Sequence, residues 1–519
     1  MNQNLIILPV ILPFIGALIG LLAPKSPNTQ TRIGIATFAA TFAASIAILL
    51  KVNTAGHLTL LLGGWEAPFG ISFVVDRLAG LMVAVSCLVG LAVAIFSKDD
   101  LESSLRSNWF YPLSLFLVGA VNGSFITGDL FNLYVWFEIM LISSFALMTV
   151  GNTKSQFEGG FKYVAINLIA SAFFLAGLGL LYGKMGTLNM ADIALKLSVS
   201  PAGPLVNSSS ALLLVAFSVK AGLFPFFFWL PASYHTPPSA ITALFGGLLT
   251  KVGVYAIMRN YTLIFTQEAD FIRGTILALS LATMLVGVFG ATSHFDMKRI
   301  LCFHIISQIG YMTLGLALFT QLAIASAIFY TAHHIIVKTN LLLIAGIVQK
   351  KFGTNDLSKT GSLLKKAPWL AILFLIPCLS LGGIPPLSGF WAKYSLVKEA
   401  LSLEYYLTAG LALIVGVMTL YSMTKIWSEV FWKKAPEEEK ITFNKTTWNS
   451  YLPVGMFCLL TVFIGLNPQI LFTYAEAAAD QLLRPNQYIE AVLSTEYIDT
   501  IRKASFAANT LNISENDLP

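Results

Sequence analysis

Five ionisable side chains lie deep inside long apolar stretches of this sequence, where a charge is costly. One is an acid, Glu138, near the middle of the apolar run 129–150. The other four are lysines in separate apolar runs: Lys220, Lys251, Lys338 and Lys393. Because an ionised group in a hydrocarbon-length segment is expensive, such a group indicates a functional site. One buried acid together with several buried bases predicts a chain that moves ions.

The segment around Lys220 has the composition of a switchable proton carrier. Gly222 and Pro225 follow the lysine. Glycine and proline weaken a helix, so we expect the run 209–230 to unwind near the middle of the membrane. Desolvation disfavours the ammonium form of Lys220, whereas a nearby carboxylate such as Glu138 favours it. These opposed effects suit a group that takes up and releases a proton.

A second apolar run, 369–399, is interrupted in the same manner before Lys393. Its breaking residues are Gly383, Pro385 and Pro386. Interrupted helices in two corresponding halves of a chain are a sequence sign of inverted repeats around an ion path at the membrane midplane. We therefore expect two inverted five-helix repeats, formed by the fourth to eighth and the ninth to thirteenth helices.

Histidines extend the set of proton-carrying candidates. His334 and Lys338 are four residues apart and share a helix face, with His333 beside them. Histidine titrates near neutral pH, so this group predicts a proton relay. Zinc binding is disfavoured, because no Cys, Asp or Glu close by completes a tetrahedral set. Structural roles stay open: a core histidine, and lysines that snorkel to the surface at Lys251 or Lys393.

The composition is that of a polytopic membrane protein. Of the 519 residues, 56% are hydrophobic and 11% are charged, whereas soluble domains average about 25% charged residues. The net charge of +6 does not indicate a nucleic-acid partner, because the lysines and arginines lie mostly in short loops and form no basic stripe. The cysteines lie far apart within apolar runs, and we interpret them as packing residues. They are Cys87, Cys302, Cys378 and Cys458.

Apolar runs of spanning length predict about fourteen transmembrane helices. The runs are 3–22, 31–50, 77–96, 109–127, 129–150, 161–183, 209–230, 239–260, 272–292, 300–319, 322–349, 369–399, 403–432 and 450–472. Between the second and third runs, Gly-Gly and Pro-Phe-Gly turn signals flank short alternating segments. These signals predict a small extramembrane β-hairpin within residues 56–75.

Loop charges predict the orientation and complete the domain organisation. If the N-terminus is outside, the cytoplasmic loops contain most of the loop lysines and arginines, so the positive-inside rule favours both termini outside. We expect five regions: 1–108 with the first three helices and the hairpin, 109–260 as the first repeat, 261–432 as the second repeat, 433–480 with the fourteenth helix, and 481–519 as a polar tail.

Motifs for bound cofactors are absent from the sequence. It contains no P-loop, dinucleotide fingerprint, haem or iron–sulfur motif, and no nucleophile elbow. We therefore expect no cofactor and no metal to be bound by this chain.

Three segments carry a resemblance to a known family. They are GDLFNLYVWFEIMLISSFALMTVG, SVKAGLFPFFFWLPASYHTPPSAITALFGGLLTKVGVYA and LSLGGIPPLSGFWAKYSLV. They resemble the D subunits of the Mrp multisubunit sodium/proton antiporters. More broadly, the sequence is similar to the antiporter-like membrane subunits of respiratory complex I and of membrane-bound hydrogenases. The resemblance runs through nearly all of the predicted helices.

The resemblance implies an all-α fold of fourteen helices, with two inverted repeats and broken seventh and twelfth helices. It implies that Glu138 is the central acid of the family, and that the proton relay consists of Lys220, Lys251, His333, His334, Lys338 and Lys393. It also implies a secondary transporter subunit, not an enzyme, in the bacterial cell membrane. Its partners would be other Mrp subunits, the lipid bilayer, protons and a monovalent cation.

Two other functions stay open. One is a subunit of a complex I-like oxidoreductase or a hydrogenase, in which partner proteins drive the same relay with redox energy. The other is an assembly scaffold whose charges serve only packing. Neighbouring genes for iron–sulfur subunits would indicate the first, and unchanged transport after neutralisation of the buried charges would indicate the second.

We expect Glu138→Ala to abolish antiport in a complex that still assembles, because the substitution removes the charge that biases Lys220. Glu138→Asp should retain part of the activity, since the charge survives at a shorter reach. Sodium/proton exchange in membranes from cells that express the whole operon measures both variants. Full exchange by an assembled Glu138→Ala complex would refute the role of this carboxylate.

Overall fold

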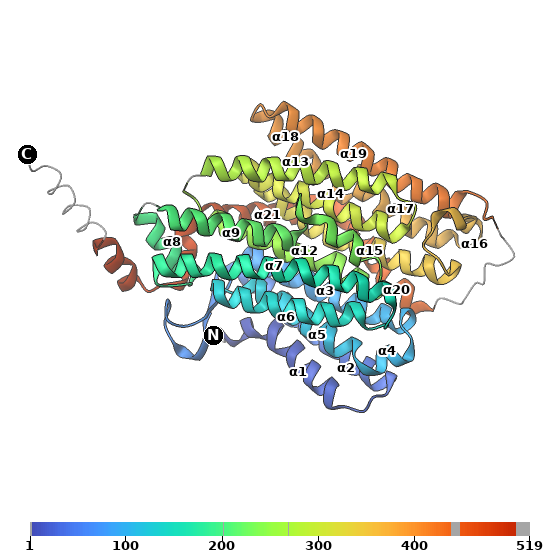
Figure 1. The fold of residues 1–519 in the computed structure, drawn as a ribbon, viewed down its shortest axis with the longest axis horizontal. Coiled ribbons are helices and arrows are strands. Elements are labelled where there is room, and N and C mark those ends of the chain that lie inside the picture. Colours follow the sequence, from blue (N-terminus) through green and yellow to red (C-terminus); the bar gives the residue numbers. More distant parts are fainter. Residues whose placement is uncertain (1–2, 201, 268, 437–446, 505–519) are drawn as a thin grey trace, which may run out of the picture.

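The computed structural model describes residues 3–200, 202–267, 269–436 and 447–504. Most of this part of the chain is helical, and the long helices lie side by side along one common direction (Figure 1). Such an arrangement is what a bilayer demands, because a helix satisfies its own backbone hydrogen bonds.

The elements follow one another in three groups. The first group is η1 (Gln3–Ile7), α1 (Leu8–Leu22), α2 (Pro27–Ala55), β1 (Leu58–Leu61), η2 (Leu62–Gly64), β2 (Ser72–Val75), α3 (Arg77–Asp100), α4 (Ser103–Asn108), α5 (Phe110–Ile126), α6 (Leu130–Thr149), α7 (Lys154–Met185) and α8 (Met190–Val199). The second group is α9 (Pro204–Ala221), η3 (Phe226–Phe228), α10 (Trp229–Ser233), α11 (Ser239–Leu244), η4 (Phe245–Leu249), α12 (Thr250–Leu263), α13 (Ala269–Ser293), α14 (Met297–Leu318) and α15 (Gln321–Phe352). The third group is η5 (Leu357–Lys359), α16 (Leu363–Lys366), α17 (Pro368–Gly382), α18 (Ser388–Ser402), α19 (Tyr406–Trp427), η6 (Ser428–Trp432), α20 (Trp448–Leu466), α21 (Pro468–Leu483) and α22 (Pro485–Val492).

Each predicted apolar run contains helix. Among the described residues, 12 helices are long and apolar enough to cross a membrane, and α5 and α17 are shorter apolar helices. The predicted class, an all-α polytopic membrane protein, is therefore confirmed. The number of spans and the inverted repeats stay predictions.

Side-chain caps determine where several helices begin. The carboxylate of Asp129 accepts a hydrogen bond from the amide of Asn132 at 2.7 Å and starts α6. Thr153 and Gln156 form a capping box at the start of α7. A cap satisfies amides that have no partner inside the helix. The cap at Asp129 thus sets the register of the helix that carries Glu138.

Two helices end at glycines within predicted apolar runs. α9 ends where Gly222 has φ 78°, and α17 ends where Gly383 has φ 87°. At both ends, the residue after the glycine donates its amide to the carbonyl five residues back, at 3.0 Å in the first case and 3.1 Å in the second. This is the Schellman motif, in which a left-handed glycine stops a helix and satisfies its last carbonyls. The chain resumes a helical course at η3 and at α18.

Helix α15 lies at the centre of the described structure. It contacts α3, α14, α18, α20 and α21, and the most apolar window of this span is buried throughout. The side chains of His333, His334 and Lys338 on this helix are 0% exposed. Their charges therefore cannot reach the surface by snorkelling.

The last predicted apolar run, 450–472, does not form one helix. α20 ends at Leu466, and α21 begins at Pro468, because proline has no amide to donate and is tolerated at the first position of a new helix. α21 packs against α15 and α3, and α22 packs against α8. The predicted polar tail, 481–519, is thus helical over α22, and its residues 505–519 lie outside the described part of the chain.

The predicted hairpin is present between α2 and α3. Strands β1 and β2 pair antiparallel, with Leu58 opposite Val75, and an isolated bridge joins Phe73 to Thr127 in front of α6. Figure 1 shows the hairpin and α8 at one end of the molecule, and α4 and α16 at the other. The hairpin therefore lies against the end of the bundle at which α6 begins.

A buried ion pair joins distant segments at the same end. Arg259 Nη2 of α12 lies 2.6 Å from Asp76 Oδ2, and the other carboxylate oxygen caps α3 by accepting from the amide of Ala79 at 2.9 Å. The ring of Tyr488 in α22 lies 5.3 Å from the guanidinium carbon. Burial alone would raise the pKa of Asp76, but the adjacent guanidinium, the amide of Ala79 and His57 together outweigh this effect and hold the pKa below its usual value.

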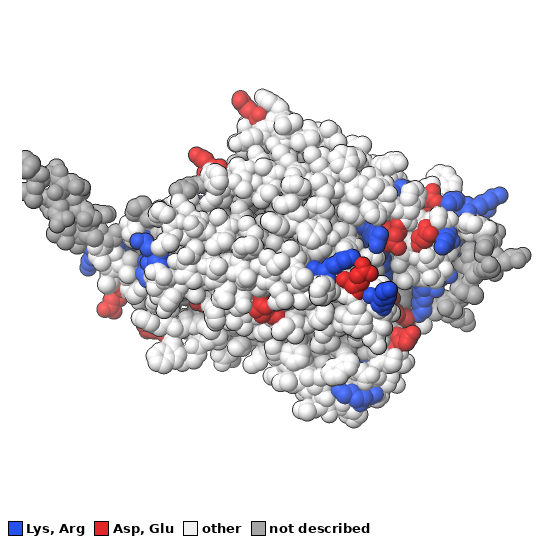
Figure 2. Space-filling model, viewed as in Figure 1, with Lys and Arg blue, Asp and Glu red and all other residues white. Residues whose placement is uncertain are grey.

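The surface has the charge distribution of a membrane protein. Figure 2 shows charged side chains gathered toward the two ends of the molecule, with few across the middle of this face. Large apolar side chains such as Phe161 and Ile142 are 75% and 69% exposed. Such a band suits contact with lipid or with apolar partner subunits.

We expect Arg259→Met to destabilise the assembled complex by about 3–5 kcal/mol, because it leaves the Asp76 carboxylate buried and unpaired. The thermal midpoint of the purified complex in detergent measures the loss. The matched control is Glu158→Gln, which breaks the exposed pair with Lys162 (2.7 Å) and should leave the midpoint unchanged. Equal midpoints for the two variants would contradict a stabilising role for the buried pair.

Candidate functional site

Glu138 lies on α6 and Lys220 lies on α9, and α7 packs against both helices. The carboxylate of Glu138 is partly buried and accepts a hydrogen bond from the hydroxyl of Ser171 on α7. The ammonium of Lys220 lies 5.6 Å from the ring centre of Phe137, the neighbour of Glu138. Among the described residues, the Lys220 ammonium has no hydrogen-bond acceptor. Because no hydrogen-bond acceptor fixes the Lys220 ammonium, a nearby charge such as that of Glu138 can influence it.

An aromatic cluster encloses this ammonium on one side. The rings of Phe137, Phe174 and Phe217 come from α6, α7 and α9 and pack edge to face, with centres 5.0–6.2 Å apart. All three rings are 0% exposed. Because an apolar wall lowers the local dielectric, a charge change on Glu138 acts on Lys220 more strongly than it would in water.

The next base, Lys251, lies where α12 crosses α9. A Cβ atom at Gly253 would come within 2.5 Å of the amide nitrogen of Ala221 and 2.9 Å of the carbonyl carbon of Lys220. Only glycine therefore allows this crossing. Lys251 is 0% exposed, and its ammonium donates to the carbonyl of Gly246 at 2.6 Å. That carbonyl belongs to η4, a π-helical turn of the kind that often marks functional sites.

A second close crossing brings η4 against α15. A Cβ atom at Gly247 would clash with the hydroxyl of Thr339, which follows Lys338 in the chain. The ammonium of Lys338 donates to the carbonyl of Leu301 on α14 at 3.2 Å. One turn earlier on α15, both ring nitrogens of His334 lack a partner among the described residues. An unpartnered imidazole at full burial is costly, and such a group calls for a functional explanation.

A third close crossing joins α15 to α18. His333 Nδ1 lies 2.7 Å from the hydroxyl of Ser388. A Cβ atom at Gly389 would clash with the carbonyl of Ser380 and come within 2.9 Å of His333 Nε2. One turn along α18, the ammonium of Lys393 donates to the carbonyl of Leu381 at 2.8 Å. This carbonyl lies in the last turn of α17, just before the Gly383 break.

The structure thus places the predicted bases on four helices, α9, α12, α15 and α18. α9 packs against α12, the π-helical turn η4 that leads into α12 packs against α15, and α15 packs against α18. The three close crossings described above depend on the glycines Gly253, Gly247 and Gly389. Of the predicted breaking residues, Gly222 and Gly383 end helices in the left-handed conformation. Pro225 follows in the turn before η3, and Pro385 and Pro386 follow in the turn before α18.

The groups that hold the bases were not foreseen from the sequence. Ser171 binds Glu138, Ser388 binds His333, and three lysines use backbone carbonyls. Every residue has a carbonyl, so no sequence signal marks those three. Ser388 comes two residues after Pro386 of the second break, and this position was the one sequence signal that could have indicated its contact with a buried base.

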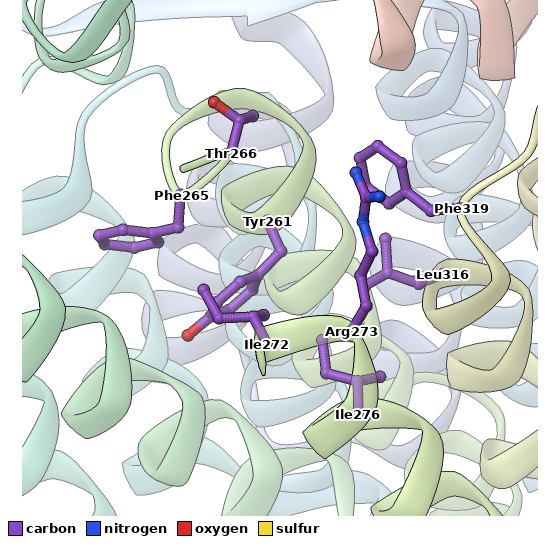
Figure 3. Close-up of a pocket in the computed structure, with 8 residues that line it drawn as sticks. All are labelled: Tyr261, Phe265, Thr266, Ile272, Arg273, Ile276, Leu316 and Phe319. Carbon is purple, nitrogen blue, oxygen red and sulfur yellow. The ribbon is translucent and has the colours of Figure 1, made fainter. Parts of the chain in front are cut away.

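A small hollow between α12, α13 and α14 lies apart from these bases (Figure 3). Figure 3 shows Arg273 extended along one wall, with its guanidinium beside the ring of Phe319. The guanidinium carbon lies 3.7 Å from that ring centre, a cation–π contact. The hollow contains none of the predicted relay residues, and we assign no function to it.

Comparison with known proteins identifies a family model. The family described as "NADH:quinone oxidoreductase/Mrp antiporter, TM" matches residues 127–419. This range extends from just before α6 into α19 and contains all of the candidate residues named above.

Curated relatives match over almost the whole chain. The D subunit of the Na(+)/H(+) antiporter of Alkalihalophilus pseudofirmus is 47% identical over 492 residues, which cover 95% of this chain and 99% of that protein. The corresponding D subunit of the Na(+)/H(+) antiporter of Bacillus subtilis is 38% identical, with the same two coverages. Among solved structures, a chain of the Mrp complex from Dietzia sp. DQ12-45-1b is similar with a TM-score of 0.89 and 31% identity, over 95% of this chain and 100% of that chain.

We expect Gly389→Ala to destabilise the protein by about 1–3 kcal/mol, because the added methyl group pushes α18 away from α17 and His333. The matched control is Gly410→Ala on α19, where a Cβ atom meets nothing within 4 Å. Thermal midpoints of the purified complexes in detergent measure both. A Gly389→Ala midpoint as high as that of the control would show that the crossing tolerates a side chain.

Proposed function

This chain belongs to the NADH:quinone oxidoreductase/Mrp antiporter family, with the D subunits of Na+/H+ antiporters as its relatives, and we propose that it carries protons along its buried line of bases. It is a subunit of a multisubunit Na+/H+ antiporter and a secondary transporter rather than an enzyme. Its partners are the other subunits of that membrane complex.

The succession of buried bases on contacting helices carries this proposal. A charged side chain at the centre of a spanning helix costs about 2.5–3.5 kcal/mol on insertion scales. Because each buried lysine adds such a cost, a role in packing alone does not explain four of them in one chain. The order of helix contacts gives protons the route Lys220, Lys251, the α15 histidines with Lys338, and Lys393.

Two of the lysines, Lys251 and Lys393, have a polar environment that fits a group with changing charge. The ammonium groups of Lys251 and Lys393 each donate to one backbone carbonyl, which favours the charged form, while burial favours the neutral amine. His333 and His334 lie on α15, which packs against η4 on the side of Lys251 and against α18 on the side of Lys393. A neutral imidazole accepts a proton at one nitrogen and donates from the other, so it can pass a proton between lysines.

Glu138 acts on the first base through its charge. No ion pair between Glu138 and Lys220 is among those of the described residues, and the carboxylate is instead held by Ser171. The carboxylate thus modulates the lysine from a distance across the Phe137 ring. Because Glu138 is only partly buried in the single chain, a neighbouring subunit has access to the same carboxylate.

We further propose that both termini face the outside of the cell. The N-terminus, the hairpin and α8 gather at one end of the bundle (Figure 1). The opposite end contains α16 with Lys365 and Lys366, Lys350 in the last turn of α15, and Lys359 at the end of η5. The positive-inside rule places the lysine-rich end in the cytoplasm.

The two halves of the bundle are proposed to be inverted repeats, 109–260 and 261–432. The shared hydrogen-bond pattern at Gly222 and Gly383 supports this relation. In each half, the break lies beside a lysine of the proposed route. Discontinuous helices at the midplane are the usual sites of transported ions in repeat-built transporters.

We expect Lys251→Met and Lys338→Met each to lower sodium/proton exchange at least about tenfold, which corresponds to about 1.4 kcal/mol in the barrier. Both substitutions keep the side-chain length and remove the proton-binding amine. Lys365→Met, at an exposed position on α16, is the control and should exchange normally. Exchange is measured in everted membrane vesicles that contain the whole complex. Normal rates in assembled Lys251→Met and Lys338→Met complexes would exclude the proposed route.

A further inference from the structure

A second polar line leaves Lys338 along α14. The ammonium of Lys338 donates to the carbonyl of Leu301, and His304 follows three residues later on the same helix. His304 is 0% exposed. Residues three apart on a helix are neighbours on its surface, so this imidazole lies close to the Lys338 ammonium without belonging to the route from α9 to α18.

His304 connects α14 to α19. Its Nε2 atom lies 3.0 Å from the hydroxyl oxygen of Ser422, and that hydroxyl donates to the carbonyl of Ala291 in α13 at 3.4 Å. The Nδ1 atom of His304 has no partner among the described residues. A buried nitrogen without a partner costs about 1–3 kcal/mol. A smaller polar residue could link α14 to Ser422 without leaving a buried nitrogen unpaired.

Lys425 continues the line toward the end of the bundle. It follows Ser422 by three residues on α19, so the two side chains share a helix face. Its ammonium donates to the carbonyls of Thr292 at 2.8 Å and of His294 at 2.7 Å. These carbonyls lie where α13 ends and the loop to α14 begins.

This loop lies at the lysine-rich end of the molecule. The backbone of Asp296 pairs with Asp356 in the segment after α15, near Lys350 and Lys359. Ser422 is ten residues before Trp432, where the α19 span ends, or about 15 Å along the helix. Polar groups thus extend from the centre of the bundle to this end.

We propose that His304, Ser422 and Lys425 form a second proton route, which connects Lys338 with the solvent at the α13–α14 loop. The proposal rests on the proposed function of Lys338. His304 takes a proton at Nδ1 from the side of Lys338 and releases one from Nε2 to the hydroxyl oxygen of Ser422, which gives up its own proton to the neutral amine of Lys425. Lys425 exchanges the proton with solvent at the loop, and rotation or tautomer exchange of the imidazole resets the route.

Substitution of His304 tests the route in the whole complex. His304→Gln keeps a hydrogen-bonding amide next to Ser422 but cannot carry a proton. We expect sodium/proton exchange to fall at least about tenfold, or about 1.4 kcal/mol in the barrier, with normal assembly. Lys338→Met in the same preparation separates the two proposals. Normal exchange in His304→Gln beside lost exchange in Lys338→Met would overturn the second route alone, and normal exchange in both would refute the proposed function.

Thiol accessibility provides a readout that a structural role would not change. Ser422→Cys should react with a membrane-impermeant methanethiosulfonate reagent from the side of the α13–α14 loop only, and the reaction should block exchange. The control is Val415→Cys, two turns deeper on the same face of α19 and 0% exposed. The unmodified chain, whose four cysteines are buried, gives the background. No reaction at Ser422→Cys above that of Val415→Cys, or reaction from the opposite side, would overturn the route.

Discussion

A protonated amine among apolar helices needs a polar partner within reach, and this requirement shapes the centre of the molecule. Lys251 finds the carbonyl of Gly246 in a π-helical turn. Lys393 finds the carbonyl of Leu381 in the last turn before a helix break. Carbonyls are available at such places because the regular hydrogen-bond ladder is disturbed or ends there. The irregular backbone is therefore part of how the charge is held.

The same requirement explains the glycines at the helix crossings. Gly253 and Gly389 let one backbone approach the next near the bases, and Gly247 leaves room for the hydroxyl of Thr339 beside Lys338. A larger residue would separate the helices and lengthen the distance between successive bases. Small residues at helix contacts are a general device of membrane proteins, where close packing replaces the hydrophobic drive to associate. Here close packing also brings together helices that carry the buried bases.

The ends of the bundle are held by different forces. At the hairpin end, the pair of Asp76 and Arg259 joins α3 to α12, with Tyr488 of α22 beside it. Sequence reasoning found the hairpin but not this pair, because the partners are 183 residues apart and each has a plausible solvent-exposed role in its own segment. The division of the run 450–472 was also missed, since Asn467 and Pro468 lie within an otherwise apolar stretch.

The sequence by itself determined which segments are apolar helices, where charge interrupts them, and that Gly222 and Gly383 disturb two of them. These features depend on local composition and backbone freedom, which the sequence shows directly. Only the tertiary structure decided which carbonyls three of the buried lysines bind, that His333 faces Ser388, and that His304 meets Ser422. Such pairings join helices far apart in the chain, and the residue types alone permit many of them. Packing selects one set: Lys251, Lys338 and Lys393 each donate to one backbone carbonyl.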